Sequence, residues 1–239
     1  MRFYLLEDPS LTKDGIVTES GLSPFAIKDC ALIAIATGKK AQNLRELREH
    51  LRHIEPGSIY YHFWGGLLRP RFDDPEYHND FASWIAHSLH NKRLAERLAV
   101  INPSTYESME AVKNELIETI EESLDETEFP TWAERDAQFE FIRYQIVVFD
   151  TKLSVNNPKN FVDIIPGLSL GSIFYHFIDA RRRNPNSLDD FQNWLLNFEG
   201  EYGVLCHMIS GVCPYFTPLK KLREELSEVF KAYFQKEEP

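Results

Sequence analysis

The chain has 239 residues, of which 43% are hydrophobic and 13% aromatic, so it can bury a full core in one or two domains. Its formal net charge of −11 argues against nucleic-acid binding and against binding to anionic membranes, because both need a positive surface. Its three cysteines, Cys30, Cys206 and Cys213, fit neither a zinc-site spacing nor a CxxC motif, which indicates reduced thiols.

We do not expect the first residues to form a targeting segment. The apolar stretch Met1–Leu6 is followed at once by Glu7 and Asp8, and it is too short for a signal peptide. The longest apolar run, Ala31–Ala36, is far shorter than the roughly 20 residues of a membrane span. We therefore expect a cytoplasmic protein that begins with an irregular N-terminal arm over residues 1–24.

The next segment, Phe25–Thr37, carries conflicting signals. Ser23 and Pro24 resemble a cap and a first-turn proline, and Gly38 resembles a helix C-terminus, so we predict a helix. The β-branched residues within it favour a strand instead, and that alternative stays open. The same choice between helix and strand arises at residues 139–150, which also contain runs of aromatic and β-branched residues.

After residue 42 the chain predicts a series of amphipathic helices, each with apolar residues three or four positions apart. The apolar positions are Leu44, Leu47, Leu51 and Ile54; then Ile59, Phe63 and Leu67; then Phe81, Trp84, Ile85 and Leu89; then Leu94, Leu98 and Ile101; and finally Met109, Val112, Leu116, Ile120 and Leu124.

An internal repeat organises the whole chain. The sequence Gly57–Phe63 recurs as Gly171–Phe177, 114 positions later, with one position changed. Beyond this motif the offset becomes 110, because the first half has four more residues, about one helical turn. The sequence therefore predicts a mainly α fold of two tandem helical repeats related by a pseudo-twofold axis, with possible short strands at the start of each repeat. The repeats cover residues 25–124 and 139–239, joined by an acidic linker at 125–138.

Three segments of the first repeat resemble a bacterial family of uncharacterised proteins. They are Ser-Ile-Tyr-Tyr-His at Ser58–His62, Asn-Asp-Phe-Ala-x-Trp at Asn79–Trp84, and Leu-Ala-Glu-Arg-Leu at Leu94–Leu98. The second half departs from the second and third segments. The resemblance implies no established activity, but it implies an association with sugar-nucleotide glycosyltransferases of the trehalose type.

His62 and His176 are the histidines that recur between the halves, and each follows a serine by four residues, on one face of a helix. They are structural if each ring holds its motif helix to a neighbouring element. If the two motif helices meet at the pseudo-twofold axis, both histidines face one cavity and can bind a metal, haem or a small ligand. A third alternative is catalysis, with Asp80 or Asp190 orienting the ring.

Arginines follow the motif in both halves and suit a phosphate or carboxylate ligand. Ion pairs with Asp73 or Asp179 explain them without a ligand. If a ligand exists, we expect it between these arginines and the motif. The candidate ligand-binding residues are Tyr61, His62, Arg69, Arg71, Tyr175, His176, Arg181 and Arg182. The unrepeated pairs His50–His53 and His87–His90 fit a zinc site, but solvated helix faces explain them more simply.

No nucleotide-binding, nucleophile-elbow or metalloprotease motif occurs in the chain. We expect no cofactor, and we favour a non-catalytic binding or adaptor protein that uses a groove between its halves. The partner is another protein or a small ligand, and a homodimer is possible. The alternative is a protein or enzyme that binds a metal or small ligand through His62 and His176.

Overall fold

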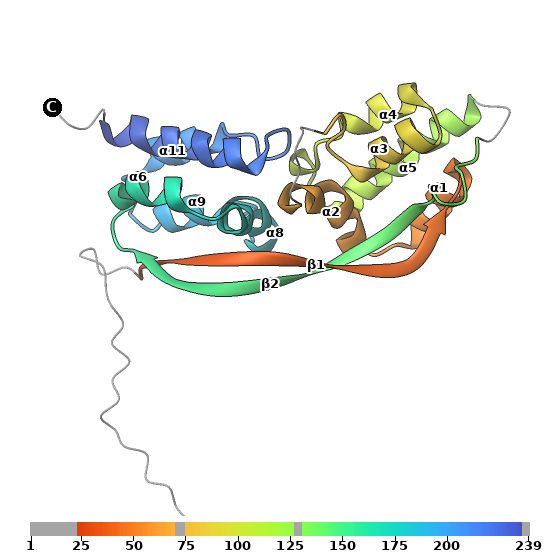
Figure 1. Ribbon diagram of the computed structural model, residues 1–239. Coiled ribbons are helices and arrows are strands. Elements are labelled where there is room, and N and C mark those ends of the chain that lie inside the picture. The colour runs from red at the N-terminus through yellow and green to blue at the C-terminus, as the bar shows by residue number, and fades with distance from the viewer. Residues whose placement is uncertain (1–22, 70–74, 127–130, 236–239) are drawn as a thin grey trace, which may run out of the picture.

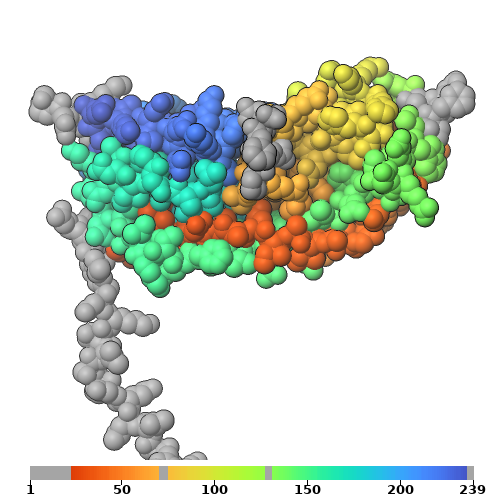
Figure 2. Space-filling model, viewed as in Figure 1, coloured from red at the N-terminus to blue at the C-terminus, as the bar shows by residue number. Residues whose placement is uncertain are grey.

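The computed structural model describes residues 23–69, 75–126 and 131–235. Two long strands, β1 (Phe25–Ala41) and β2 (Phe139–Val155), pair antiparallel and form a ribbon. The helices lie along one side of this ribbon, in two groups (Figure 1). Figure 2 shows the same arrangement in space-filling form, with the ribbon forming one margin of the molecule.

The prediction of a mainly α fold is wrong, and the fold is mixed α/β. Helices are more numerous, but residues 25–37 and 139–150 both lie in 17-residue strands, not in helices. The β-branched and aromatic side chains decide this, because they pack well on a pleated surface. Gly38, which the sequence suggested as the end of a helix, lies within β1. Its φ is +76°, and it stands at an irregularity of the ladder between Ala36 and Lys40.

The ladder between the strands has twofold symmetry. Leu32 pairs with Ile146, which is the residue 114 positions later, so the symmetry axis passes through this pair. The register shifts twice, at Ala36–Lys40 in β1 and opposite Ala26–Lys28 in β2. At these bulges Thr37 donates to the Phe141 carbonyl and Thr151 donates to the Ile27 carbonyl, both at 2.6 Å. Corresponding residues of the two halves therefore make corresponding contacts.

Two helical groups cover the ribbon, and we call them the first and the second body. The first body contains α1 (Leu44–His53), α2 (Pro56–Trp64), the 3-10 helices η1 (Gly65–Leu68) and η2 (Pro103–Thr105), α3 (Asp80–Ser88), α4 (Lys92–Ala99) and α5 (Met109–Asp125). The second body contains the 3-10 helices η3 (Pro158–Asn160) and η4 (Ile165–Gly167), the π-helix η5 (Phe174–Asp179), α6 (Phe161–Ile164), α7 (Leu170–Ile173), α8 (Ala180–Arg183), α9 (Asp190–Leu195), α10 (Gly203–Ser210) and α11 (Leu219–Gln235).

Each body is completed by the strand of the other half. The ring of Phe139, at the start of β2, stacks on Phe81 of the first body with centroids 5.0 Å apart. Phe25, at the start of β1, stacks on Phe191 of the second body at 5.3 Å. The bodies are therefore not the two tandem repeats that the sequence predicts, because the halves exchange the beginnings of their strands.

The indole nitrogens of two corresponding tryptophans fix this exchange. Trp84 donates to the Ala137 carbonyl at 2.7 Å, just before β2, and Trp194 donates to the Ser23 carbonyl at 2.9 Å, just before β1. Both are largely buried with their neighbouring phenylalanines. Because each hydrogen bond joins one half's helices to the other half's strand, the two halves fold as one unit.

The four extra residues of the first half coincide with a difference between the helices that follow the motif in the two halves. In the first half the motif helix α2 is followed by the 3-10 helix η1, whereas in the second half the motif runs through α7 into the π-helix η5 and then α8. Among the described residues, no helix is long and apolar enough to cross a membrane.

Candidate functional site

The motif serine and histidine of the first half both bind one residue of β2. The Nε2 of His62 accepts a hydrogen bond from the Ile142 N–H at 3.1 Å, and the hydroxyl of Ser58 donates to the Ile142 carbonyl at 2.7 Å. The other ring nitrogen, Nδ1, donates to Asp80 at 2.9 Å. Since Nε2 accepts, the hydrogen bonds assign the proton to Nδ1. The pair satisfies the backbone of an edge strand, as a third strand would.

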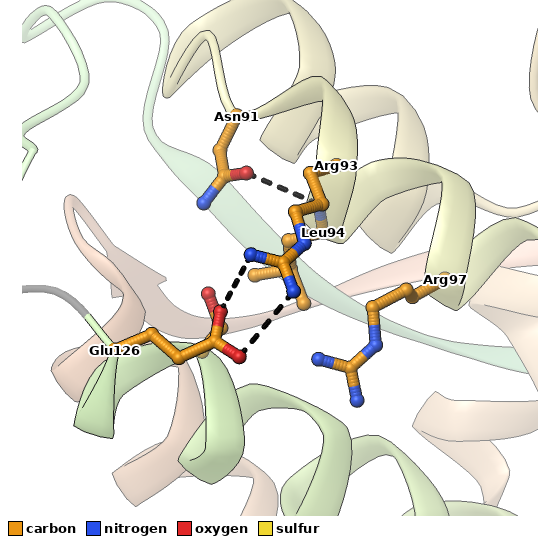
Figure 3. Close-up of a pocket in the computed structure, with 6 residues that line it drawn as sticks. Asn91, Arg93, Leu94, Arg97 and Glu126 are labelled. Carbon is orange, nitrogen blue, oxygen red and sulfur yellow. Dashed lines mark hydrogen bonds and ion pairs between the residues drawn. The ribbon is translucent and has the colours of Figure 1, made fainter.

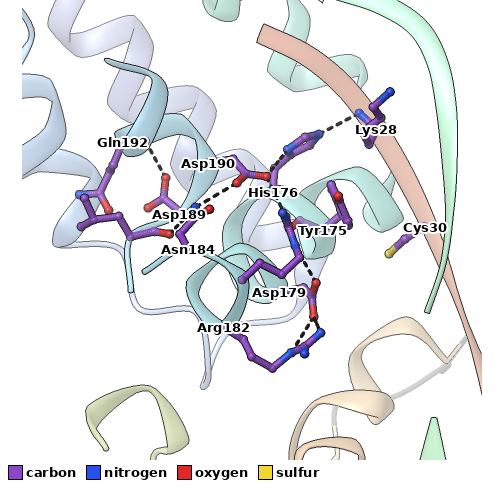
Figure 4. Close-up of polar contacts among 12 residues, drawn as sticks. Lys28, Cys30, Tyr175, His176, Asp179, Arg182, Asn184, Asp189, Asp190 and Gln192 are labelled. Carbon is purple, nitrogen blue, oxygen red and sulfur yellow. Dashed lines mark hydrogen bonds and ion pairs between the residues drawn. The ribbon is translucent and has the colours of Figure 1, made fainter. Parts of the chain in front are cut away.

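The second half repeats this arrangement at His176 (Figure 4). Its Nε2 accepts from the Lys28 N–H at 2.8 Å, and its Nδ1 donates to Asp190 at 2.8 Å. Lys28 and Ile142 are themselves 114 positions apart. Ser172 differs from Ser58, because its hydroxyl accepts a hydrogen bond from Ser169 at 3.0 Å.

The two motif histidines do not share a cavity. Each is 3% exposed and is surrounded by rings, such as Phe139 at 4.7 Å from His62 and Phe25 at 4.8 Å from His176. Their strand partners lie eight residue pairs apart on the ribbon, since Ile142 pairs with Ala36, which puts them roughly 26 Å apart. Within the described ranges, no group of three or more His, Cys, Asp or Glu residues can hold a metal ion.

Asp190 is held by Arg183 as well as by His176. Arg183 donates to Asp190 at 2.8 Å, and its guanidinium lies 3.9 Å from the centroid of the Tyr175 ring. Burial raises the pKa of Asp190, but the hydrogen bonds from His176 and Arg183 outweigh it, so the pKa lies below its usual value. Tyr175 and His176 therefore belong to a closed structural network.

The first half pairs its candidates differently. Arg69 donates to the hydroxyl of Tyr61, and its guanidinium lies 5.1 Å from the centroid of that ring. Arg71 and Asp73 lie outside the described residues. Tyr61 and Arg69 are thus partners of each other, and the structure does not bring them together with Arg181 or Arg182.

A buried carboxylate joins the two bodies. Asp179, at the end of η5, is fully buried and forms ion pairs with Arg182 at 2.9 Å and Arg183 at 3.0 Å. The hydroxyl of Tyr60, from α2 of the first body, donates to the same carboxylate at 3.3 Å. Burial, followed by the charge of Asp179, raises the pKa of Tyr60 well above its usual value. For the arginines that follow the motif, the sequence left two explanations open, a bound ligand or an ion pair with Asp179. The ion pair is the explanation that applies to Arg182.

A cleft of about 540 Å³ lies between the bodies, beside this cluster. The first body lines it from α2, η2 and the start of α5, and the second body from α8 and the loops that follow α8 and α10. Of the predicted candidates, the structure brings Arg181 and Arg182 together here, without the motif histidines. Sequence reasoning missed Tyr60 and Trp64, which also line the cleft. Tyr60 had a signal, because it is the one motif position that changes between the halves, to Phe174.

A smaller pocket of about 190 Å³ lies between α4 and α5 (Figure 3). Its arginines already have carboxylate partners: Arg93 forms an ion pair with Glu126 at 3.0 Å, and Arg97 forms one with Glu122. Two of the unrepeated histidines bind carbonyls of their own helices: the Nδ1 of His53 binds the Glu49 carbonyl at 3.0 Å, and the Nδ1 of His87 binds the Ser83 carbonyl at 2.7 Å. Both arginines among the described residues that line this pocket are therefore already paired.

The family model of DUF5752, a family of unknown function, matches residues 22–231. The chain belongs to this family. This confirms the expectation of an uncharacterised domain family. The chain is also similar to a solved structure described as OrfY from Thermoproteus tenax, with 26% identity and a TM-score of 0.75, over 88% of this chain and 95% of that one. A comparison with curated proteins gives no match.

Proposed function

We propose that this DUF5752 protein is a non-catalytic adaptor that binds its partner at the cleft between the two bodies. The observation that carries the proposal is the cleft itself, because it is lined by both bodies and by an apolar wall that includes Trp64, Pro103 and Met109. Concave, largely apolar sites between structural units are common binding sites. The motif histidines, which are the obvious catalytic candidates, are already engaged with the strand backbone.

The resemblance of the motif segments to a family associated with trehalose-type glycosyltransferases supplies the first partner to test. The experiment is capture of such an enzyme from the same genome by the immobilised protein. Replacing Ser104, an exposed residue of the cleft wall, with Trp should reduce capture at least tenfold, because the indole occupies the space of the partner.

A matched control is Val204→Trp, since Val204 is 66% exposed and is not part of the cleft wall. It should capture the enzyme as the unmodified protein does. An equal loss of capture in both variants, or capture unaffected by Ser104→Trp, would contradict a role for the cleft.

Metal analysis of freshly purified protein tests the alternative function, a metal-binding protein. Stoichiometric metal that disappears in His62→Ala and His176→Ala would favour that function over the adaptor.

A further inference from the structure

Arg181 lies in the cleft wall, and its side chain forms no hydrogen bond with any residue that the structure describes. Its guanidinium is 4.7 Å from the centroid of the Phe177 ring, and its nearest carboxylate oxygen, on Asp189, is 3.7 Å away, beyond hydrogen-bond distance. Its Nε is buried and has no hydrogen-bond partner in the described part of the chain. Because Nε is buried, a ligand in the cleft reaches the exposed terminal nitrogens, which form no hydrogen bond within the described residues and are free to donate to an anion.

The neighbouring arginines differ from Arg181 in this respect. Arg182 donates to Asp179 from both Nε and a terminal nitrogen, at 3.3 and 2.9 Å. Arg183 donates to Asp179, to the Tyr175 carbonyl and to Asp190. Arg181 is instead held in place by ring packing and a long ion pair, while about a quarter of its side chain stays exposed at the cleft. This is a pre-positioned anion receptor.

The remaining walls define the rest of the ligand. The cleft volume of about 540 Å³ suits a small organic molecule. Beyond the arginines, half of the residues that line it are aromatic or proline, and the others include Glu107, which disfavours a second anionic group. The shape and charge therefore fit one anionic group joined to an apolar body.

We propose that the cleft binds a small organic anion, whose single carboxylate or phosphate group accepts hydrogen bonds from Arg181 while its apolar part lies between the two bodies. A ligand there also touches both bodies, so it regulates the binding of the protein partner. This last consequence rests on the proposed adaptor function, whereas the binding of the anion does not.

The test is calorimetric titration of the intact protein with phenyl phosphate and with benzoate. We expect saturable binding of at least one of them, with inorganic phosphate and phenol each binding at least tenfold more weakly. Arg181→Met should weaken the binding at least tenfold, because the charge-assisted hydrogen bonds are lost. Arg97→Met, which removes a paired arginine of the smaller pocket, should change the affinity less than twofold.

Thermal unfolding checks that Arg181→Met still folds, and Ser104→Trp provides a second variant that blocks the cleft without removing a charge. No binding of either probe at millimolar concentration, or binding that survives both variants, would overturn the inference. Phenyl phosphate binding no tighter than inorganic phosphate would overturn it too. If neither probe binds but the protein partner is still captured, this inference fails and the adaptor function stands.

Discussion

At the scale of single residues, both motif histidines bind the strand backbone, and in the first half the motif serine does so as well. Ser58 and His62 bind the carbonyl and the N–H of the same residue, Ile142, so an edge strand is satisfied by one helix. The spacing indicated that both side chains share a helix face. Their partner is 80 or more positions away, on the strand of the other half, and no local pattern predicts such a contact.

Because they share a partner, Ser58 and His62 should be energetically coupled. Ser58→Ala and His62→Ala are each expected to lower the free energy of unfolding by about 1–3 kcal/mol. The double variant should depart from the sum by at least about 0.5 kcal/mol. Urea unfolding measures all three. His87→Ala is the control, with an expected effect below about 0.5 kcal/mol, because this side chain is 61% exposed. If the losses of the two single variants add up to that of the double variant, Ser58 and His62 do not act together on Ile142.

Asp189 is a second residue whose burial has a measurable consequence. It is fully buried, it caps α9 through the Gln192 N–H at 2.9 Å, and burial raises its pKa to about 7, against a partial offset from that hydrogen bond and from Arg181. In the unfolded chain the pKa is about 3.9. The folded state therefore binds this proton more tightly, and its contribution to stability is full below pH 4 and is lost as the pH rises to 7.

Asp189→Asn removes this titration and keeps the cap, since an amide oxygen also accepts the Gln192 N–H. The variant should gain stability relative to the unmodified protein as the pH rises from 4 to 7, by up to about 4 kcal/mol. Urea unfolding at several pH values measures the difference. Asp150→Asn is the control: hydrogen bonds from the Lys152 backbone and side chain lower the Asp150 pKa to about 2, so its contribution to stability is lost only as the pH falls from about 4 to 2, and its difference should stay nearly flat from pH 4 to 7. A flat difference for Asp189→Asn would contradict the assignment.

At the scale of elements, two glycines that are equivalent in the sequence have different roles. A Cβ on Gly57, in α2, would meet no atom within 4 Å. A Cβ on Gly171, in α7, would lie 2.1 Å from Asp29 and 2.4 Å from the Cys30 carbonyl, both in β1. Cys30 also donates its thiol hydrogen to the Gly171 carbonyl at 3.3 Å. Close approach of helix and strand therefore requires glycine in the second half.

Gly171→Ala should consequently destabilise the protein by about 2 kcal/mol or more, because α7 must move away from β1. Gly57→Ala is the matched control. It should leave stability unchanged or raise it by up to about 1 kcal/mol, because alanine favours the helix. Thermal unfolding of both variants tests the pair, and a similar loss in both would show that the motif glycines are equivalent.

The helices between residues 44 and 125 were predicted because their apolar spacing is a local property, and Asn43 and Asn79 cap α1 and α3. The strands were not predicted, because Ser23, Pro24 and Gly38 give helix signals locally, while the ladder that forms the strands joins residues 98 to 130 positions apart. In the cleft, Arg181 and Arg182 were predicted from their place after the motif. Tyr60 was missed because its role depends on Asp179, in the other body.

At the scale of the whole molecule, strand exchange makes each body depend on both halves of the chain. The rings of Phe139 and Phe141, from β2, lie in the first body around His62, and Phe25, from β1, lies in the second body. The duplicated sequence thus does not fold as two separable repeats. The core contacts across the exchange are apolar and buried, so they resist separation without denaturant.

Cutting the chain between the two halves should therefore leave the molecule assembled. After cleavage at a protease site introduced between Glu126 and Thr131, we expect the two fragments to co-elute in size-exclusion chromatography with the circular dichroism of the uncut chain. They should separate only in urea, where the strand ladder is lost. The uncut chain carrying the same site is the control. Fragments that separate in native buffer while each keeps its helices would show that the halves are independent repeats, because neither would then need the strand that the other supplies.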